Sequence, residues 1–248
     1  MADIINSLNA ANYITVKVTD NPIVNGNNLL SAYIEAKTKT PNGSALSTSN
    51  RLGIILPPAI YDLGTQSLTL DTEYIDIIGS TNDKSKHYIK SNITVGSRGV
   101  ITQTANDVKI INLTVKILGG ALINLDQNDP AAYFPNTNLN NTYIENVEFK
   151  SVTESLNGFS PVDGFSTRYS IEYSGTYINC KGYYLFFNNI ASGTFKDCLG
   201  GAELCVPNAN GTFINCTGGN NSFGGGPGGI VNGTFINCKG GAGSFEPT

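Results

Sequence analysis

Apolar and polar residues recur along this chain in one short sequence motif. "GTFINCTGG" at 211–219 returns as "GTFINCKGG" at 233–241, and "SGTFKDCLGG" at 192–201 comes before both. Each copy places an aromatic residue two positions before an Asn or Asp, and a cysteine directly after it. A fourth copy has its Asn at position 179. From this Asn179, the Asn or Asp residues of successive copies are 18, 18 and 22 residues apart. A repeat of this size indicates stacked structural units.

Two upstream segments carry the same pattern without the cysteine. "TYIENVEF" supplies Asn146 and "VKIINLTV" supplies Asn112, at steps of 33 and 34 residues. Alternate residues of a strand face the same side, so the apolar residue two positions before each Asn or Asp is predicted to point inward, as is the cysteine after it. The predicted core ladder consists of Ile110, Ile144, Tyr177, Phe195, Phe213, Phe235, Cys180, Cys198, Cys216 and Cys238.

The Asn or Asp of each copy is predicted to form a corner. Keeping both the preceding aromatic residue and the following cysteine inward breaks strict alternation, which requires a bend between them. Asn and Asp tolerate the left-handed backbone that such a bend needs, and stacked amides can hydrogen-bond to one another along the axis. The predicted ladder of corners is Asn112, Asn146, Asn179, Asp197, Asn215 and Asn237.

One unit of this repeat has the length of one coil of a parallel β-helix, in which coils stack at roughly 4.8 Å. We therefore predict an all-β fold, a right-handed single-stranded parallel β-helix with an N-terminal capping α-helix. The left-handed form needs an aliphatic residue at every sixth position, which "GTFINCTGGNNSFGGGPGG" does not supply. The β-helix is expected over 27–248, with longer coils at 51–174, loops inserted at 125–140 and 155–170, and short regular coils at 175–248.

The N-terminal part differs from the repeats. Residues 27–39, "NNLLSAYIEAKTK", have the apolar rhythm of an amphipathic helix after an Asn cap. Such a helix would cover the open end of the stack, where the core would otherwise meet water. Residues 1–26 are expected to form an attachment segment, with "ANYITVKVTD" at 11–20 as its strand.

The order of these segments resembles the start of pectin-lyase-like right-handed parallel β-helix proteins. The helix is followed by "IILPPAIYDLG", then "SLTLDTEYIDIIGS", then coils marked by Asn-Cys. The resemblance covers about residues 20–248 and is greatest to bacteriophage and virus proteins, tail spikes included. Such proteins include polysaccharide lyases, glycoside hydrolases, adhesins and purely structural parts, so the fold does not determine the function.

Composition excludes several classes of protein. The net charge is −4, charged residues make up 14% of the chain, and Lys and Arg do not cluster as they do in nucleic-acid-binding proteins. No apolar run reaches the roughly 18 residues of a membrane span. The first residues lack the layout of a secretory signal, so we expect synthesis in a host cytoplasm. Five cysteines without a CxxC pair, and His87 as the only histidine, favour neither disulfides nor a metal site. No cofactor is predicted.

Candidate catalytic residues are sparse. Glycoside hydrolysis needs two carboxylates roughly 5 to 10 Å apart, and a pair drawn from Glu145, Glu148, Glu172 and Asp163 is conceivable. Solvated charges on an outer face are the alternative interpretation. Asp126 and Asp129 could hold calcium but lack the pattern of a calcium-binding loop. We assign no catalytic or metal-binding residue.

Two outward columns flank the corners. The position before each corner is occupied by Ile111, Glu145, Ile178, Lys196, Ile214 and Ile236, and the position two residues further upstream by Lys109, Tyr143, Thr176, Thr194, Thr212 and Thr234. A monomer rarely leaves a partly apolar stripe bare. The candidate interface is therefore Ile178, Ile214, Ile236, Thr176, Thr194, Thr212 and Thr234, packed against another copy, as in a trimer, or against another virion protein. A loop of the same chain covering the stripe is the alternative.

These features favour a non-enzymatic structural or adhesive protein of a virion: a spike, a fibre component or a capsid decoration. The alternative is a phage polysaccharide depolymerase, a lyase or hydrolase that acts on a surface glycan. A protein of the extracellular surface that binds ice or a matrix through its Thr column is a third possibility. Neither a nucleic acid nor a membrane is expected as a partner.

Overall fold

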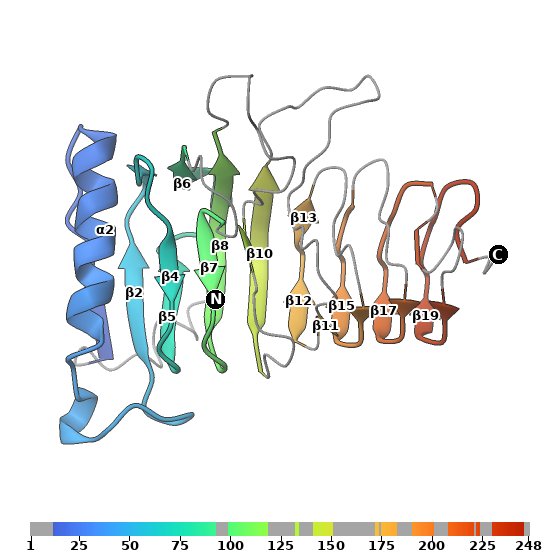
Figure 1. Ribbon diagram of the computed structural model, residues 1–248, viewed down its shortest axis with the longest axis horizontal. Coiled ribbons are helices and arrows are strands. Elements are labelled where there is room, and N and C mark those ends of the chain that lie inside the picture. The colour runs from blue at the N-terminus through green and yellow to red at the C-terminus, as the bar shows by residue number, and fades with distance from the viewer. Residues whose placement is uncertain are drawn as a thin grey trace.

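The computed structural model describes a stack of β-coils closed at one end by a helix (Figure 1). The described residues are 12–92, 99–118, 132–133, 141–150, 172–173, 175–182, 190–200, 208–220, 222–223 and 230–245. The predicted loops at 125–140 and 155–170 lie outside them, except for 132–133.

The strands form three sheets in which every pairing of strands is parallel. The main sheet has 12 strands, and its central path runs β1-β2-β5-β8-β10-β12-β15-β17-β19. These strands are β1 (Tyr13–Thr15), β2 (Leu52–Leu56), β5 (Ile75–Gly79), β8 (Lys109–Ile117), β10 (Tyr143–Lys150), β12 (Thr176–Ile178), β15 (Thr194–Lys196), β17 (Thr212–Ile214) and β19 (Thr234–Ile236). Off this path lie β3 (Ala59–Asp62), β6 (His87–Ser91) and β13 (Lys181–Gly182).

Two smaller sheets complete the coils. One has the order β11-β14-β16-β18 and the other the order β4-β7-β9. Their strands are β11 (Glu172–Tyr173), β14 (Ile190–Ala191), β16 (Asn208–Ala209), β18 (Ile230–Val231), β4 (Leu68–Leu70), β7 (Ile101–Gln103) and β9 (Ala132–Tyr133). Since successive coils return to the same sheet in parallel, and such crossovers are right-handed, the chain is an all-β, right-handed parallel β-helix.

Each corner has the backbone that the repeat predicts. The φ angles at the Asn and Asp positions are all left-handed: 59° at Asn112, 53° at Asn146, 50° at Asn179, 54° at both Asp197 and Asn215, and 53° at Asn237. The side-chain amides donate along the stack, from Asn146 to Asn112 (2.8 Å), Asn179 to Asn146 (3.0 Å), Asn215 to Asp197 (2.9 Å) and Asn237 to Asn215 (3.3 Å).

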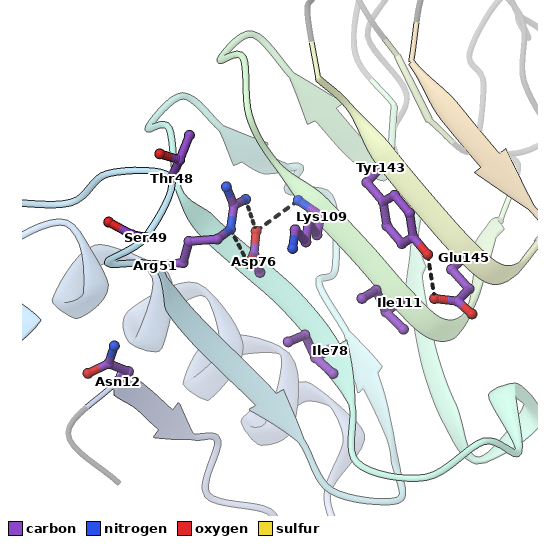
Figure 2. A pocket seen from close by; sticks show the side chains of 10 residues that line it. All are labelled: Asn12, Thr48, Ser49, Arg51, Asp76, Ile78, Lys109, Ile111, Tyr143 and Glu145. Atoms are coloured by element: carbon purple, nitrogen blue, oxygen red, sulfur yellow. Dashed lines mark hydrogen bonds and ion pairs between the residues drawn. The ribbon is translucent and has the colours of Figure 1, made fainter. Parts of the chain in front are cut away.

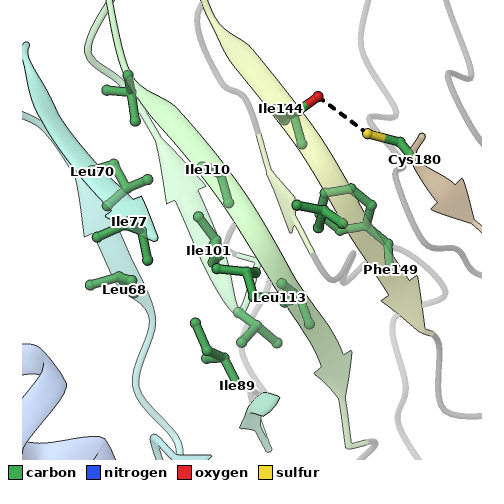
Figure 3. Packing of buried hydrophobic residues seen from close by; sticks show 14 of the residues in the cluster. Leu68, Leu70, Ile77, Ile89, Ile101, Ile110, Leu113, Ile144, Phe149 and Cys180 are labelled. Atoms are coloured by element: carbon green, nitrogen blue, oxygen red, sulfur yellow. Dashed lines mark hydrogen bonds between the residues drawn. The ribbon is translucent and has the colours of Figure 1, made fainter. Parts of the chain in front are cut away.

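Aromatic rings and thiols fill the interior of the last coils. Tyr177, Phe195, Phe213 and Phe235 stack with ring centroids 4.9, 4.8 and 5.1 Å apart. Beside them, Cys180, Cys198 and Cys216 are buried free thiols and Cys238 is half-buried. Each thiol donates to a carbonyl of the preceding coil, as Cys216 does to Phe195 (3.4 Å). In the earlier coils aliphatic residues, including Ile110 and Ile144, fill the same interior (Figure 3).

The capping helix α2 spans Pro22–Ala36, so it begins five residues before the predicted start at 27 and ends three residues before 39. The side chain of Asn21 accepts from the backbone N–H groups of Ile23 and Val24, and Pro22 occupies the first turn, where a missing N–H costs nothing. The backbone of Gly26 packs so closely on β3 that a methyl group there would overlap the carbonyl of Asp62. Short 3-10 turns follow at η2 (Pro41–Gly43) and η3 (Lys84–Lys86).

The strand expected within residues 11–20 is not separate from the β-helix. It is β1, which pairs with β2 in parallel and forms the edge of the main sheet. Residues 51–64 and 66–80, which include the segments "IILPPAIYDLG" and "SLTLDTEYIDIIGS", contain four strands. Pro57-Pro58 separates β2 from β3, and Tyr74, with φ 65°, turns the chain between β4 and β5.

Candidate functional site

The outer face of the main sheet carries two columns of side chains along the whole stack. Strand register places one member of each column on each of the nine strands. The first column is Tyr13, Gly53, Asp76, Lys109, Tyr143, Thr176, Thr194, Thr212 and Thr234. The second is Thr15, Ile55, Ile78, Ile111, Glu145, Ile178, Lys196, Ile214 and Ile236.

The first half of this face holds a groove of about 290 Å³ (Figure 2). Ile78 and Ile111 line it and are 5% and 4% exposed, so the second outward column is covered at these two positions. Thr48 and Ser49, which follow η2, lie at one end of the groove.

An ion pair occupies the centre of the groove. The guanidinium of Arg51 donates to both carboxylate oxygens of Asp76, with 2.8 Å between Nε and Oδ2, and also to the carbonyl of Asp107. Asp76 accepts in addition from the backbone N–H of Lys109 (2.9 Å). The side chain of Asp76 is only 7% exposed. A carboxylate held by this many donors is committed to a structural role.

The far side of the groove pairs a phenol with a carboxylate. The hydroxyl of Tyr143 donates to Oε2 of Glu145 (2.8 Å), and the ammonium of Lys109 lies 5.9 Å from the centre of the Tyr143 ring. Burial, then the hydrogen bond to Glu145 and the charge of that carboxylate, raise the pKa of Tyr143 to about 12. The hydroxyl therefore stays protonated and fixes Glu145, while the groove presents one cation and one carboxylate to solvent.

The structure does not bring the four candidate carboxylates together among the described residues. Glu145 lies in the groove, whereas Glu148 lies beyond the corner at Asn146 and contacts Lys181 (3.4 Å) and Lys150 (3.7 Å). Asp163, Asp126 and Asp129 lie outside the described residues, and of Glu172 only the backbone is described. In the described part of the chain no group of three or more His, Cys, Asp or Glu is placed to hold a metal ion.

The second half of the outer face is the stripe of the candidate interface. Ile236 is 46% exposed, Ile178 and Ile214 are half-buried, Thr194 and Thr234 are exposed, and Thr176 and Thr212 are half-buried. Lys196 interrupts the isoleucine column and is exposed. The stripe is therefore a regular surface of threonine and isoleucine with one charge.

Sequence reasoning missed the groove because its main ion pair comes from coils that lack the repeated sequence motif. Arg51 and Asp76 precede the first corner at Asn112, so no repeat aligned them with Lys109 or Tyr143. The available signal was alternation in "YIDIIG", where Asp76 stands between two isoleucines.

The described part of the chain includes no helix that is long and apolar enough to cross a membrane. No family model matches the sequence, and no curated protein matches it.

The chain is similar in structure to three solved proteins at low sequence identity. The first is pectin methylesterase PemA from Erwinia chrysanthemi, with 14% identity over 83% of this chain and 54% of that one and a TM-score of 0.43. The second is a pectin methylesterase in complex with a hexasaccharide, with 17% identity over 72% of this chain and 50% of that one and a TM-score of 0.39. The third is ORF18 of Geobacillus virus E2, with 12% identity over 96% of this chain and 61% of that one and a TM-score of 0.34. The chain thus spans between half and about three-fifths of the length of these proteins. The parallel β-helix itself is established by the strand pairing of this chain.

Proposed function

We propose that this protein is a structural or adhesive component of a virion, namely a spike, a fibre component or a capsid decoration, and that it has no catalytic activity. The stripe on β12, β15, β17 and β19 is the observation that supports this proposal. Its in-register threonine and isoleucine columns form a regular surface on a stack held by backbone ladders, stacked rings and corner amides. Such a surface suits permanent contact with a protein better than turnover of a substrate.

In this proposal the stripe packs side by side against another copy of the chain, as in a trimer, or against another virion protein. Isoleucine side chains supply the apolar contact, and threonine hydroxyls supply hydrogen bonds at its border. A variant with Ile178→Lys and Ile214→Lys places two charges in the contact and should lower the molar mass measured by light scattering. The control carries Ile23→Lys and Ile34→Lys, at residues 57% and 65% exposed on α2. An equal mass for the stripe variant and the wild type would exclude the lateral contact.

A second candidate function, depolymerisation of a surface polysaccharide, has one observation in its favour. The groove is lined by the carboxylate of Glu145, the phenol of Tyr143 that donates to it, and Lys109, whose ammonium lies 5.9 Å from the centre of the Tyr143 ring; these are groups that could bind a sugar. Against it, Asp76 is enclosed by its own ion pair. Incubation with capsular and pectic glycans, followed by assay of reducing ends and of unsaturated sugars, distinguishes the two candidates. Product formation that Glu145→Gln abolishes would favour the enzyme and refute the structural proposal.

A further inference from the structure

Two charged side chains of the groove have no partner of opposite charge among the described residues. Elsewhere on the main sheet half-buried charges are paired, as Lys90 is with Asp62 (3.0 Å). Lys109 and Glu145 are also half-buried, yet neither takes part in an ion pair within the part of the chain that the structure describes. A half-buried charge has lost part of its hydration, so it gains from a ligand that supplies the opposite charge.

Tyr143 lies between these two charges (Figure 2). The ammonium of Lys109 is 5.9 Å from the centre of the Tyr143 ring, and the Tyr143 hydroxyl donates to Oε2 of Glu145 (2.8 Å). The ammonium and the carboxylate, on the adjacent strands β8 and β10, are farther apart than the roughly 4 Å of an ion pair. Arg51 and Asp76 neutralise each other at the centre of the groove. The groove therefore offers a ligand one cation and one anion at two separate positions.

We propose that the groove is a binding site for a sugar that carries both a carboxylate and an ammonium group. The carboxylate of the sugar contacts Lys109, and its ammonium contacts Glu145. A ligand with both charges gains at both positions, whereas a ligand with one charge leaves the other side chain unpaired. This inference rests on the adhesive form of the proposed function and names the class of ligand that it recognises.

The rest of the groove favours a sugar over a peptide. Asn12, Thr48 and Ser49 add one amide and two hydroxyls to its lining, and these groups suit sugar hydroxyls, which both donate and accept. The strands beneath the groove lie inside the sheet, where β5 pairs with β2 and β8, and β8 pairs with β10. A peptide therefore finds no free strand edge here to pair with. The volume of about 290 Å³ is that of a site for a small ligand.

A titration of the isotope-labelled full chain, followed by nuclear magnetic resonance at neutral pH, tests the proposal with four ligands. Muramic acid is an amino sugar with a carboxylate, N-acetylmuramic acid retains only the carboxylate, and glucosamine has only the ammonium. ε-Aminocaproic acid carries both charges on a chain without a sugar ring. We expect muramic acid to shift the amide signals of Lys109, Tyr143 and Glu145. It should bind about three- to tenfold more tightly than each of the other ligands.

Two variants assign each charge of the ligand to one side chain. Lys109→Met removes the cation, so muramic acid and glucosamine should then bind equally. Glu145→Gln removes the anion and retains an acceptor for Tyr143, so muramic acid and N-acetylmuramic acid should then bind equally. Lys196→Met is the matched control, because Lys196 lies in the same outward column as Glu145 but outside the groove. This variant should bind muramic acid as the wild type does, and circular dichroism should be unchanged in all three.

Equal binding of muramic acid and its two singly charged relatives to the wild type would overturn the proposal. So would a loss of affinity in Lys196→Met as large as that in Lys109→Met, the absence of any shift with muramic acid, or shifts confined to residues outside the groove. Equal or tighter binding of ε-aminocaproic acid would overturn the assignment to a sugar in favour of a peptide. The variant with Ile178→Lys and Ile214→Lys should bind muramic acid as the wild type does. A failure of the lateral contact in the mass measurement is therefore distinct from a failure of this site.

Discussion

The ladder of corner side chains contains one gap, and filling it should stabilise the protein. Asn179 donates to Asn146, and Asp197 accepts from Asn215, but a carboxylate has no N–H to donate to Asn179. Asp197→Asn supplies that donor and keeps the acceptor for Asn215. Asn also tolerates the left-handed backbone at this position, where φ is 54°.

The expected increase in the free energy of unfolding depends on how exposed this corner is to solvent. A net hydrogen bond contributes about 0.5 to 1.5 kcal/mol, and Asn179 and Asp197 are both exposed, so we expect about 0.5 to 1 kcal/mol. For a chain of this size that corresponds to a rise in melting temperature of roughly 1 to 4 °C. Urea unfolding followed by circular dichroism measures the free energy of unfolding.

Controls separate the hydrogen bond from the loss of one negative charge. Asp20→Asn removes an exposed carboxylate away from the ladder and should change stability by less. Asn215→Asp removes the donor to Asp197 and places two carboxylates on adjacent coils, so it should destabilise. The reasoning is refuted if Asp197→Asn gives no gain over Asp20→Asn, or if Asn215→Asp is as stable as the wild type.

Three further predictions concern the interior and the groove. Burial lowers the pKa of His87, which is 0% exposed, so protonation favours the unfolded chain. Stability should therefore fall as the pH drops below about 6.5. In thermal melts from pH 7.5 to 5.5, the melting temperature of the His87→Gln variant should fall less than that of the wild type. Phe213→Ala should lower the free energy of unfolding, measured in urea, by about 3 to 5 kcal/mol. Phe235→Ala should lower it by less because that ring is half-buried, and equal losses would contradict the stacked interior. Arg51→Met leaves the carboxylate of Asp76 enclosed without its cation and should cost about 3 to 5 kcal/mol, most of which the added change Asp76→Leu should recover; no recovery would contradict the ion-pair account.

The sequence specified the coils because one irregularity recurred in every repeat. Two inward residues flanking an Asn or Asp are compatible with a strand only if the backbone turns at that residue, and Asn215 and its equivalents have this turn. The helix boundary was harder to predict. Apolar periodicity marked only the part of α2 that packs on the coils, whereas its first turn exposes Ile23 and Val24 and is fixed by the cap at Asn21.

The groove could not be predicted from the repeat, because its groups meet through strand register and not through a motif. Arg51 reaches Asp76 across 25 positions of sequence, and Asp76 reaches the backbone of Lys109 across 33. Only the pairing of β2, β5 and β8 brings them together. Glu145, by contrast, lies in the outward column that the alternation of β10 predicted.

The central claim, that equivalent corners lie directly over one another, is tested most directly by scalar couplings across hydrogen bonds in nuclear magnetic resonance. The structure predicts couplings from the amide nitrogen of Asp197 to the carbonyl carbon of Ile214, and from Asn215 to Ile236. Couplings from these amides to any other carbonyl would show a different register and would contradict the stack.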